Sequence, residues 1–109
     1  MSASRRTTLD VSEAQLMEWI RELCSLLRLR VFHCADARRS WGPGFPDLVI
    51  VGPGGVMFRE CKTFNGKTSA DQDSWAVTLQ EAGQDWALWR PQDWMSGRVR
   101  RELERLAIR

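Results

Sequence analysis

Residues 44–62 read GFPDLVIVGPGGVMFRECK, and the architecture of the chain follows from this stretch. Its two largely apolar segments, 47–51 and 56–62, predict a pair of strands joined by a GPGG turn, which together form a β-hairpin. The first segment is continuously apolar after its leading residue, as is typical of a strand covered on both faces. Charged residues stand at the open end of the hairpin, with Asp47 heading the first strand and Glu60 and Lys62 ending the second.

These charged residues predict a metal site. Side chains alternate along a strand, so Glu60 and Lys62 share a face, roughly 7 Å apart, while Cys61 points away. Two carboxylates, from Asp47 and Glu60, and the carbonyl oxygen of Cys61 would converge at the strand ends, a donor set that suits Mg²⁺ or Mn²⁺. Lys62 could orient a water molecule and offset charge on a phosphate, so the pattern favours phosphodiester hydrolysis. The alternative is purely structural: Asp47 begins a strand, and Glu60 pairs with Lys62.

The rest of the chain predicts an α/β domain. Ser12 with Gln15 is a plausible capping box at the start of an amphipathic helix. Further elements follow from periodicity and from Gly and Pro breaks. The expected helices cover 13–28, 70–82 and, with Asp93 as cap, 94–108; the expected strands cover 29–33, 47–51, 56–62 and 85–89. The predicted order is α-β-β-β-α-β-α within one domain over residues 12–109, preceded by a flexible segment over residues 1–11.

Composition limits the possible partners. The chain has 109 residues, 43% of them hydrophobic, which suits one folded domain. Its net charge of +2 is too small to indicate a class of partner. However, 14 of its 16 basic residues are arginine, whose planar fork suits phosphate. Arginine clusters near residues 5, 38 and 98–109 fit a nucleic-acid surface and fit an ordinary solvated surface equally well.

The cysteines and the apolar runs indicate the compartment. Cys24, Cys34 and Cys61 are odd in number and widely spaced, which argues against a disulfide framework and favours a reducing environment. No apolar run is long enough to span a membrane, and the N-terminal residues have no apolar signal core. We therefore expect a cytoplasmic protein without a membrane partner.

Four segments in this order, GFPDLVIV, ECKTFNGKTS, ADQDSW and ALWRPQDW, resemble the VRR-NUC family, a branch of the PD-(D/E)xK nucleases. The resemblance extends from about Ser12 to Trp94. It implies a restriction-endonuclease-like fold, in which an αβββαβ core contains a mixed central sheet flanked by helices, here followed by a C-terminal helix. It also implies metal-dependent phosphodiester hydrolysis with Mg²⁺ or Mn²⁺ and no organic cofactor. The implied roles are metal ligation by Asp47, Glu60 and the Cys61 carbonyl, water positioning by Lys62, and a polar catalytic contact from Gln72.

Two of the candidate catalytic residues also have structural explanations. Gln72 lies three residues after Ser69, so it completes a capping box, yet it shares a helical face with Trp75 that looks toward the sheet. Glu13 matches the acidic residue that such nucleases often carry on their first helix, yet a carboxylate in a first turn also favours the helix dipole. Both alternatives stay open for each residue.

The predicted DNA contacts surround the Pro46–Asp47 pair. We expect phosphate contacts in the loop that leads into this pair, where Trp41 is a possible stacking surface. His33, at a strand end, is either a DNA contact or a local hydrogen-bonding residue. The full set of predicted DNA-binding residues is Arg38, Arg39, Ser40, His33 and Lys67. For the C-terminal basic helix, a dimer contact through Val99, Leu103 and Leu106, DNA binding and core packing all remain possible.

The predicted function is that of a small metal-dependent DNA endonuclease. Stand-alone members of the family that the chain resembles look like Holliday-junction resolvases, so we expect a homodimer that cuts branched DNA, since both partners would share two-fold symmetry. The alternatives are a less selective or flap- and nick-directed nuclease of the same fold, and a DNA-binding module that does not cut.

Overall fold

The computed structural model describes residues 10–34 and 41–109. The elements in this part of the chain are α2 (Glu13–Leu26), β1 (Arg30–His33), β2 (Leu48–Gly52), β3 (Gly55–Cys61), α3 (Ala70–Glu81), β4 (Asp85–Trp89), α4 (Pro91–Met95) and α5 (Arg98–Leu106). The predicted α/β class and the order α-β-β-β-α-β are confirmed, and the C-terminal helical segment differs as described below.

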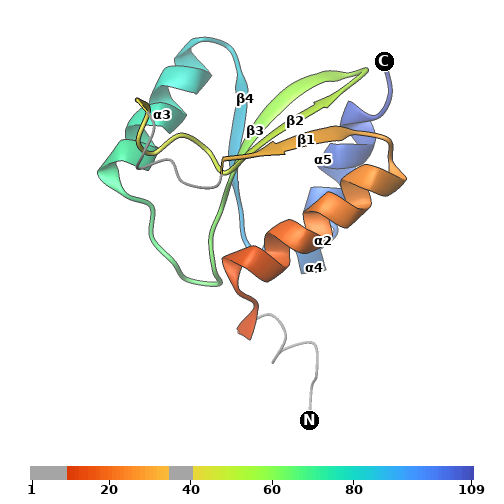
Figure 1. The fold of residues 1–109 in the computed structure, drawn as a ribbon, viewed down its shortest axis with the longest axis horizontal. Coiled ribbons are helices and arrows are strands. Elements are labelled where there is room, and N and C mark those ends of the chain that lie inside the picture. The colour runs from red at the N-terminus through yellow and green to blue at the C-terminus, as the bar shows by residue number, and fades with distance from the viewer. Residues whose placement is uncertain (1–9, 35–40) are drawn as a thin grey trace.

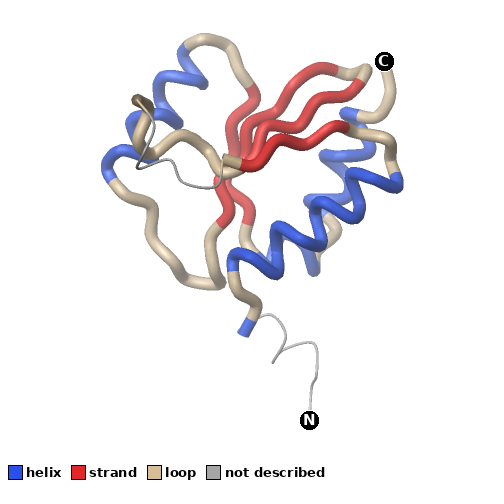
Figure 2. Tube along the Cα trace, in the orientation of Figure 1, coloured by secondary structure: helices blue, strands red, loops and turns tan. Residues whose placement is uncertain are grey.

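The four strands form one mixed sheet in the order β1-β2-β3-β4 (Figure 2). The first three strands are antiparallel neighbours, and Gly52 pairs with Gly55 at the tip of the predicted hairpin. Strand β4 pairs with β3 in parallel, so the connection between them must cross over the sheet, and α3 provides this crossover.

Helices cover both faces of the sheet. Figure 1 shows α2, α4 and α5 on one side of the strands and α3 on the other. The main core lies on the side of α2 and α5, where apolar side chains of these helices meet those of the sheet. Its buried members are Val11, Leu16, Ile20, Leu23, Cys24, Leu29, Leu48, Ile50, Met57, Cys61, Trp89, Val99, Leu103 and Leu106.

Helix α2 begins where the sequence predicts and ends two residues early. The Oγ atom of Ser12 accepts a hydrogen bond from the Gln15 N–H at 3.0 Å, as an N-cap should. The chain leaves the helix after Leu26, and Arg28 has a left-handed φ of 60°, which ends helical geometry before the predicted end at Arg28. Among the described residues, no helix is both long and apolar enough to cross a membrane.

The single C-terminal helix predicted over residues 94–108 is wrong, because the segment forms two helices. Pro91 starts α4, as its fixed φ favours at a first helical position. Asp93 is therefore inside α4 rather than before a helix, and its Oδ2 atom accepts from the Arg90 N–H at 2.8 Å. Gly97, with φ of 84°, separates α4 from α5.

The apolar face of α5 packs into the core. Val99 and Leu103 are fully buried and Leu106 nearly so. Of the three alternatives for these residues, core packing is the one that the structure bears out, since buried side chains have no surface left for a partner. The tip of the hairpin is tied to the same helix, because the Gly54 N–H donates to the Leu106 carbonyl at 2.9 Å.

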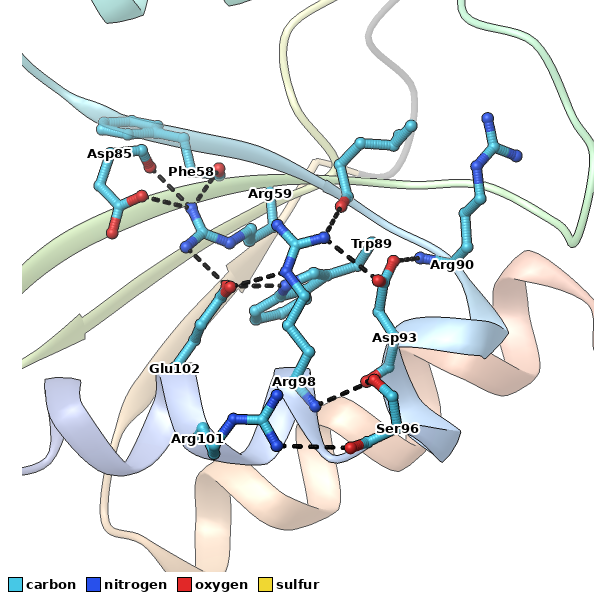
Figure 3. Close-up of polar contacts among 11 residues, drawn as sticks. Phe58, Arg59, Asp85, Trp89, Arg90, Asp93, Ser96, Arg98, Arg101 and Glu102 are labelled. Atoms are coloured by element: carbon cyan, nitrogen blue, oxygen red, sulfur yellow. Dashed lines mark hydrogen bonds and ion pairs between the residues drawn. The ribbon is translucent and has the colours of Figure 1, made fainter.

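A buried arginine joins the sheet to α5 (Figure 3). Arg59, in the middle of β3, is only 1% exposed. Its guanidinium donates to the Asp85 carbonyl at 2.8 Å and to the Glu102 carboxylate at 3.0 Å, and it lies 5.0 Å from the ring centroid of Trp89. Glu102 also accepts from the Trp89 indole at 2.9 Å and from Arg98 at 2.8 Å. This network fixes the strand residue that immediately precedes Glu60.

Candidate active site at the ends of β2 and β3

Asp47 and Glu60 meet on one face of the sheet. Leu48 pairs with Arg59, so continuing the register by one residue brings Asp47 opposite Glu60. The Cys61 N–H donates to Asp47 Oδ2 at 2.8 Å, and Asp47 lies close enough to Glu60 to raise the pKa of its carboxyl group. The predicted convergence of the two carboxyl groups is therefore present, on the face that α3 covers.

Glu60 is a buried acid in a negative environment. Its side chain is 2% exposed, and burial is the largest cause that raises its pKa to about 8. The charge and hydrogen bond of Asp47 raise the pKa further, as does Glu13, whereas the Lys62 ammonium lowers it. The metal-free pair therefore holds a proton at neutral pH, as closely placed carboxylates do when nothing else neutralises them.

Lys62 and Gln72 complete the surroundings of Glu60. Lys62 Nζ is 3.9 Å from Glu60 Oε2, and Gln72 Nε2 donates to the same oxygen at 2.9 Å. The other amide atom of Gln72, Oε1, accepts from the Ser69 N–H at 2.9 Å, while Ser69 Oγ accepts from the Gln72 N–H. The capping box and the contact with the site are thus both present, because one amide side chain can accept at one atom and donate at the other.

The loop that precedes Asp47 packs against α3 through Gly44 and Phe45. Gly44 has φ of 88°, and a Cβ atom there would lie 2.5 Å from the backbone of Asp71, so only glycine fits. Phe45 packs edge-on against Trp75 and Phe58, with centroid distances of 5.0 and 6.1 Å. Helix α3 therefore contacts the site at two points. Gln72 donates a hydrogen bond to Glu60, and Trp75 packs against Phe45 in the loop that leads to Asp47.

Cys61 contributes only backbone to the site. Its thiol is fully buried on the other face of the sheet, and burial is the main cause that raises its pKa well above the ordinary value. The Lys62 N–H donates to the Trp89 carbonyl on the β4 side, so the N–H and carbonyl of Cys61 face the opposite side, toward Asp47. All three cysteines are free; Cys24 is buried, which raises its pKa to about 11, and Cys34 is half-buried.

Glu13 and His33 differ in their relation to the pair. Glu13, in the first turn of α2, is close enough to raise the pKa of Glu60. His33 is exposed and pairs with Leu48, whose side chain faces α2. Because Asp47 is the next residue and points to the opposite face, His33 does not share the face of the carboxyl pair.

The other predicted DNA contacts are placed only in part. Arg38, Arg39 and Ser40 lie outside the described residues. Lys67 is exposed in the loop between β3 and α3, and Trp41 is fully exposed before the GF pair. Among the described residues, no hydrogen bond or ion pair joins Lys67 to Asp47 or Glu60.

Sequence reasoning missed two side chains that hold the loop after Lys62. Arg90 Nη1 donates to the Thr63 carbonyl and Gln92 Nε2 donates to the Phe64 carbonyl, both at 2.8 Å. Both side chains belong to the ALWRPQDW segment, one of the four that resemble the VRR-NUC family. Together with the β3–β4 pairing, these bonds fix the backbone on both sides of Lys62.

The donor set fits a small divalent cation. Within residues 10–34 and 41–109, no group of three or more His, Cys, Asp or Glu side chains is arranged to hold a metal ion. Mg²⁺, however, is usually held by one or two carboxylates and keeps several waters. Two adjacent carboxyl groups, one of which is buried and has a raised pKa, and a nearby carbonyl oxygen meet that requirement.

No protein-family model, curated protein or solved structure matches this chain. The likeness to the VRR-NUC family therefore rests on the sequence segments quoted above.

Proposed function

We propose that this chain is a metal-dependent nuclease that hydrolyses phosphodiester bonds in DNA, with a restriction-endonuclease-like fold of the VRR-NUC type. The observation that carries the proposal is the placement of the Asp47 and Glu60 carboxyl groups side by side at the ends of β2 and β3, with the Lys62 ammonium 3.9 Å from Glu60. A purely structural explanation accounts poorly for this cluster, because a buried carboxyl pair costs free energy unless a cation or a proton neutralises it.

Asp47, Glu60 and the Cys61 carbonyl would hold Mg²⁺ or Mn²⁺. When bound, the cation would activate a water molecule and neutralise charge on the phosphate. Glu60 would give up its proton when the cation binds, since the same oxygens cannot serve both. Gln72 keeps Glu60 in position, and its own position is fixed by Ser69 at the start of α3.

The Lys62 side chain lies beside the acidic pair. Its side chain is mostly buried, at 13% exposed, so its charge is poorly screened by solvent. An ammonium in this place can orient the attacking water and stabilise the extra negative charge that a phosphate acquires in the transition state. Glu13, whose charge reaches Glu60, adds a third acidic group at the edge of the site.

The substrate class follows from the resemblance. We propose branched DNA, such as a four-way junction, cut by a homodimer that offers one site to each of two symmetric strands. A nuclease of this fold that acts on flaps, nicks or linear duplex would share the same chemistry, so only a comparison of substrates separates the two.

Incubation with labelled junction, flap and linear duplex DNA under one salt condition tests the proposal. We expect cutting with Mg²⁺ or Mn²⁺, none with EDTA, and a loss of at least about 10²-fold in Asp47→Asn. Glu22→Gln, which changes an exposed carboxylate of α2, is the matched control and should cut normally. Cutting that survives both EDTA and Asp47→Asn would refute the metal mechanism. DNA binding without cutting by any metal would instead identify a non-cleaving DNA-binding module.

A further inference from the structure

We propose that Arg90 binds a backbone phosphate of the DNA next to the bond that is cut. The inference rests on the proposed nuclease function and adds to it a residue that no motif assigns. It concerns the ALWRPQDW segment, whose arginine the catalytic chemistry above does not use.

The sheet places Arg90 beside Lys62. Strands β3 and β4 run parallel, Glu60 pairs with Leu88 and Cys61 with Trp89, so the next pair in register is Lys62 with Arg90. Because neighbouring residues point to opposite faces, Arg90 leaves the sheet on the face of Lys62. Figure 3 agrees, since the Arg90 side chain extends away from the cluster of Arg59, Trp89 and Glu102.

The guanidinium of Arg90 is held by a backbone carbonyl and, within residues 10–34 and 41–109, is not paired with a carboxylate. Nη1 donates to the carbonyl of Thr63, the residue after Lys62, at 2.8 Å, and the side chain is half-buried. Among the described residues, no carboxylate forms an ion pair with Arg90. Arg59 and Arg98 differ sharply, because both donate to Glu102. One end of the Arg90 fork is therefore anchored, and its charge stays available to a ligand.

A phosphate is the ligand that this arrangement fits. Arginine presents several donors in one plane, which match the oxygens of a phosphate, and anchoring one of them reduces the rotamer entropy lost on binding. DNA that approaches Asp47, Glu60 and Glu13 meets like charge, so the strand needs cations close by. Lys62 and Arg90, adjacent in the sheet, provide two such charges in a row.

The competing role for Arg90 is purely structural, as a clamp on the loop after Lys62. Gln92 provides the matched control, because it makes the same kind of bond to the next carbonyl in that loop and carries no charge. A clamp should therefore respond alike to Arg90→Gln and Gln92→Ala, whereas a phosphate contact should respond only to the first. Arg90→Lys keeps the charge and tests whether a cation alone suffices.

The experiment measures how salt affects DNA binding in EDTA, so that cleavage plays no part. Fluorescence anisotropy would follow a labelled four-way junction and a linear duplex of the same sequence. Arg90→Gln should make the slope of log K against log salt less negative by about 0.9. The affinity of this variant relative to wild type should therefore rise about 3.5-fold between about 50 and 200 mM salt. Gln92→Ala and Arg90→Lys should keep the wild-type slope.

Three outcomes would contradict the assignment. A wild-type slope in Arg90→Gln would remove the phosphate contact, and an equal slope change in Gln92→Ala would leave only the clamp. A salt dependence weaker than wild type in Arg90→Lys, which keeps the positive charge, would show that Arg90 does not act through its charge. If the wild-type chain binds neither DNA, the proposed function fails as well; wild-type binding with an unchanged slope in Arg90→Gln overturns the phosphate contact alone.

Discussion

Replacing Glu60 with glutamine should stabilise the metal-free protein at alkaline pH. The pKa of Glu60 rises from 4.5 to about 8 on folding, so the folded chain binds more protons between these values and loses stability as pH rises through this window. The difference sets an upper limit of about 5 kcal/mol. Once both carboxylates are charged they can separate and admit water, so we expect Glu60→Gln to gain roughly 2–3 kcal/mol over wild type above about pH 8.

Thermal unfolding in EDTA at a series of pH values measures this gain. A change of that size corresponds to about 10 °C in Tm for a chain of this length. Near about pH 4 the two proteins should differ little, because Glu60 is then protonated in the folded state and mostly so in the unfolded state. Exposed Glu81, changed to glutamine, is the control and should shift neither curve. A Glu60→Gln difference that does not vary with pH would refute the account of the buried pair.

The remaining predictions concern Lys62, the buried arginine and the loop glycine. Lys62→Met should slow cleavage by at least about 10²-fold while DNA affinity falls much less. Single-turnover rates and binding titrations measure the two effects. An equal loss of cleavage rate and DNA affinity would argue against a role of Lys62 in the transition state. Glu102→Ala should cost about 3 kcal/mol in urea unfolding, because buried Arg59 then keeps only the exposed carboxylate of Asp85. Glu104→Ala, which breaks an exposed pair with Arg100, should cost less than about 1 kcal/mol; equal costs would contradict the burial argument. Gly44→Ala should destabilise the fold by at least about 2 kcal/mol more than Gly55→Ala, since both positions have positive φ but only Gly44 lies against α3, and matching unfolding midpoints would contradict this.

The elements that local sequence determines were predicted well. The apolar stripe of α2 and the turn between two apolar runs each lie within one segment, so the helix and the hairpin were predictable from periodicity alone. The C-terminal helices were not, because a proline can end one element or start the next, and a glycine within a helical pattern does not by itself show a break. Pro91 instead starts a helix, and Gly97 takes a left-handed conformation between two.

Within the site, residues on a single strand were easier to place than residues that meet across the fold. Strand alternation and the hairpin register sufficed to bring Asp47, Glu60 and Lys62 together. The buried network of Arg59 was not predictable from the sequence, because its partners Asp85 and Glu102 are 26 and 43 residues away. Arg90 escaped notice for the same reason, since its bond to Thr63 spans 27 residues.

The unequal burial of the three thiols gives the unmutated chain a natural attachment point for a reporter dye. Cys24 and Cys61 are buried and have raised pKa values, so neither offers a reactive thiolate to a maleimide. Cys34 is half-buried, and its N–H donates to the Asp47 carbonyl at 3.0 Å. A fluorophore coupled there would sit beside the strand end that carries Asp47 and would report any change in its surroundings without an engineered residue.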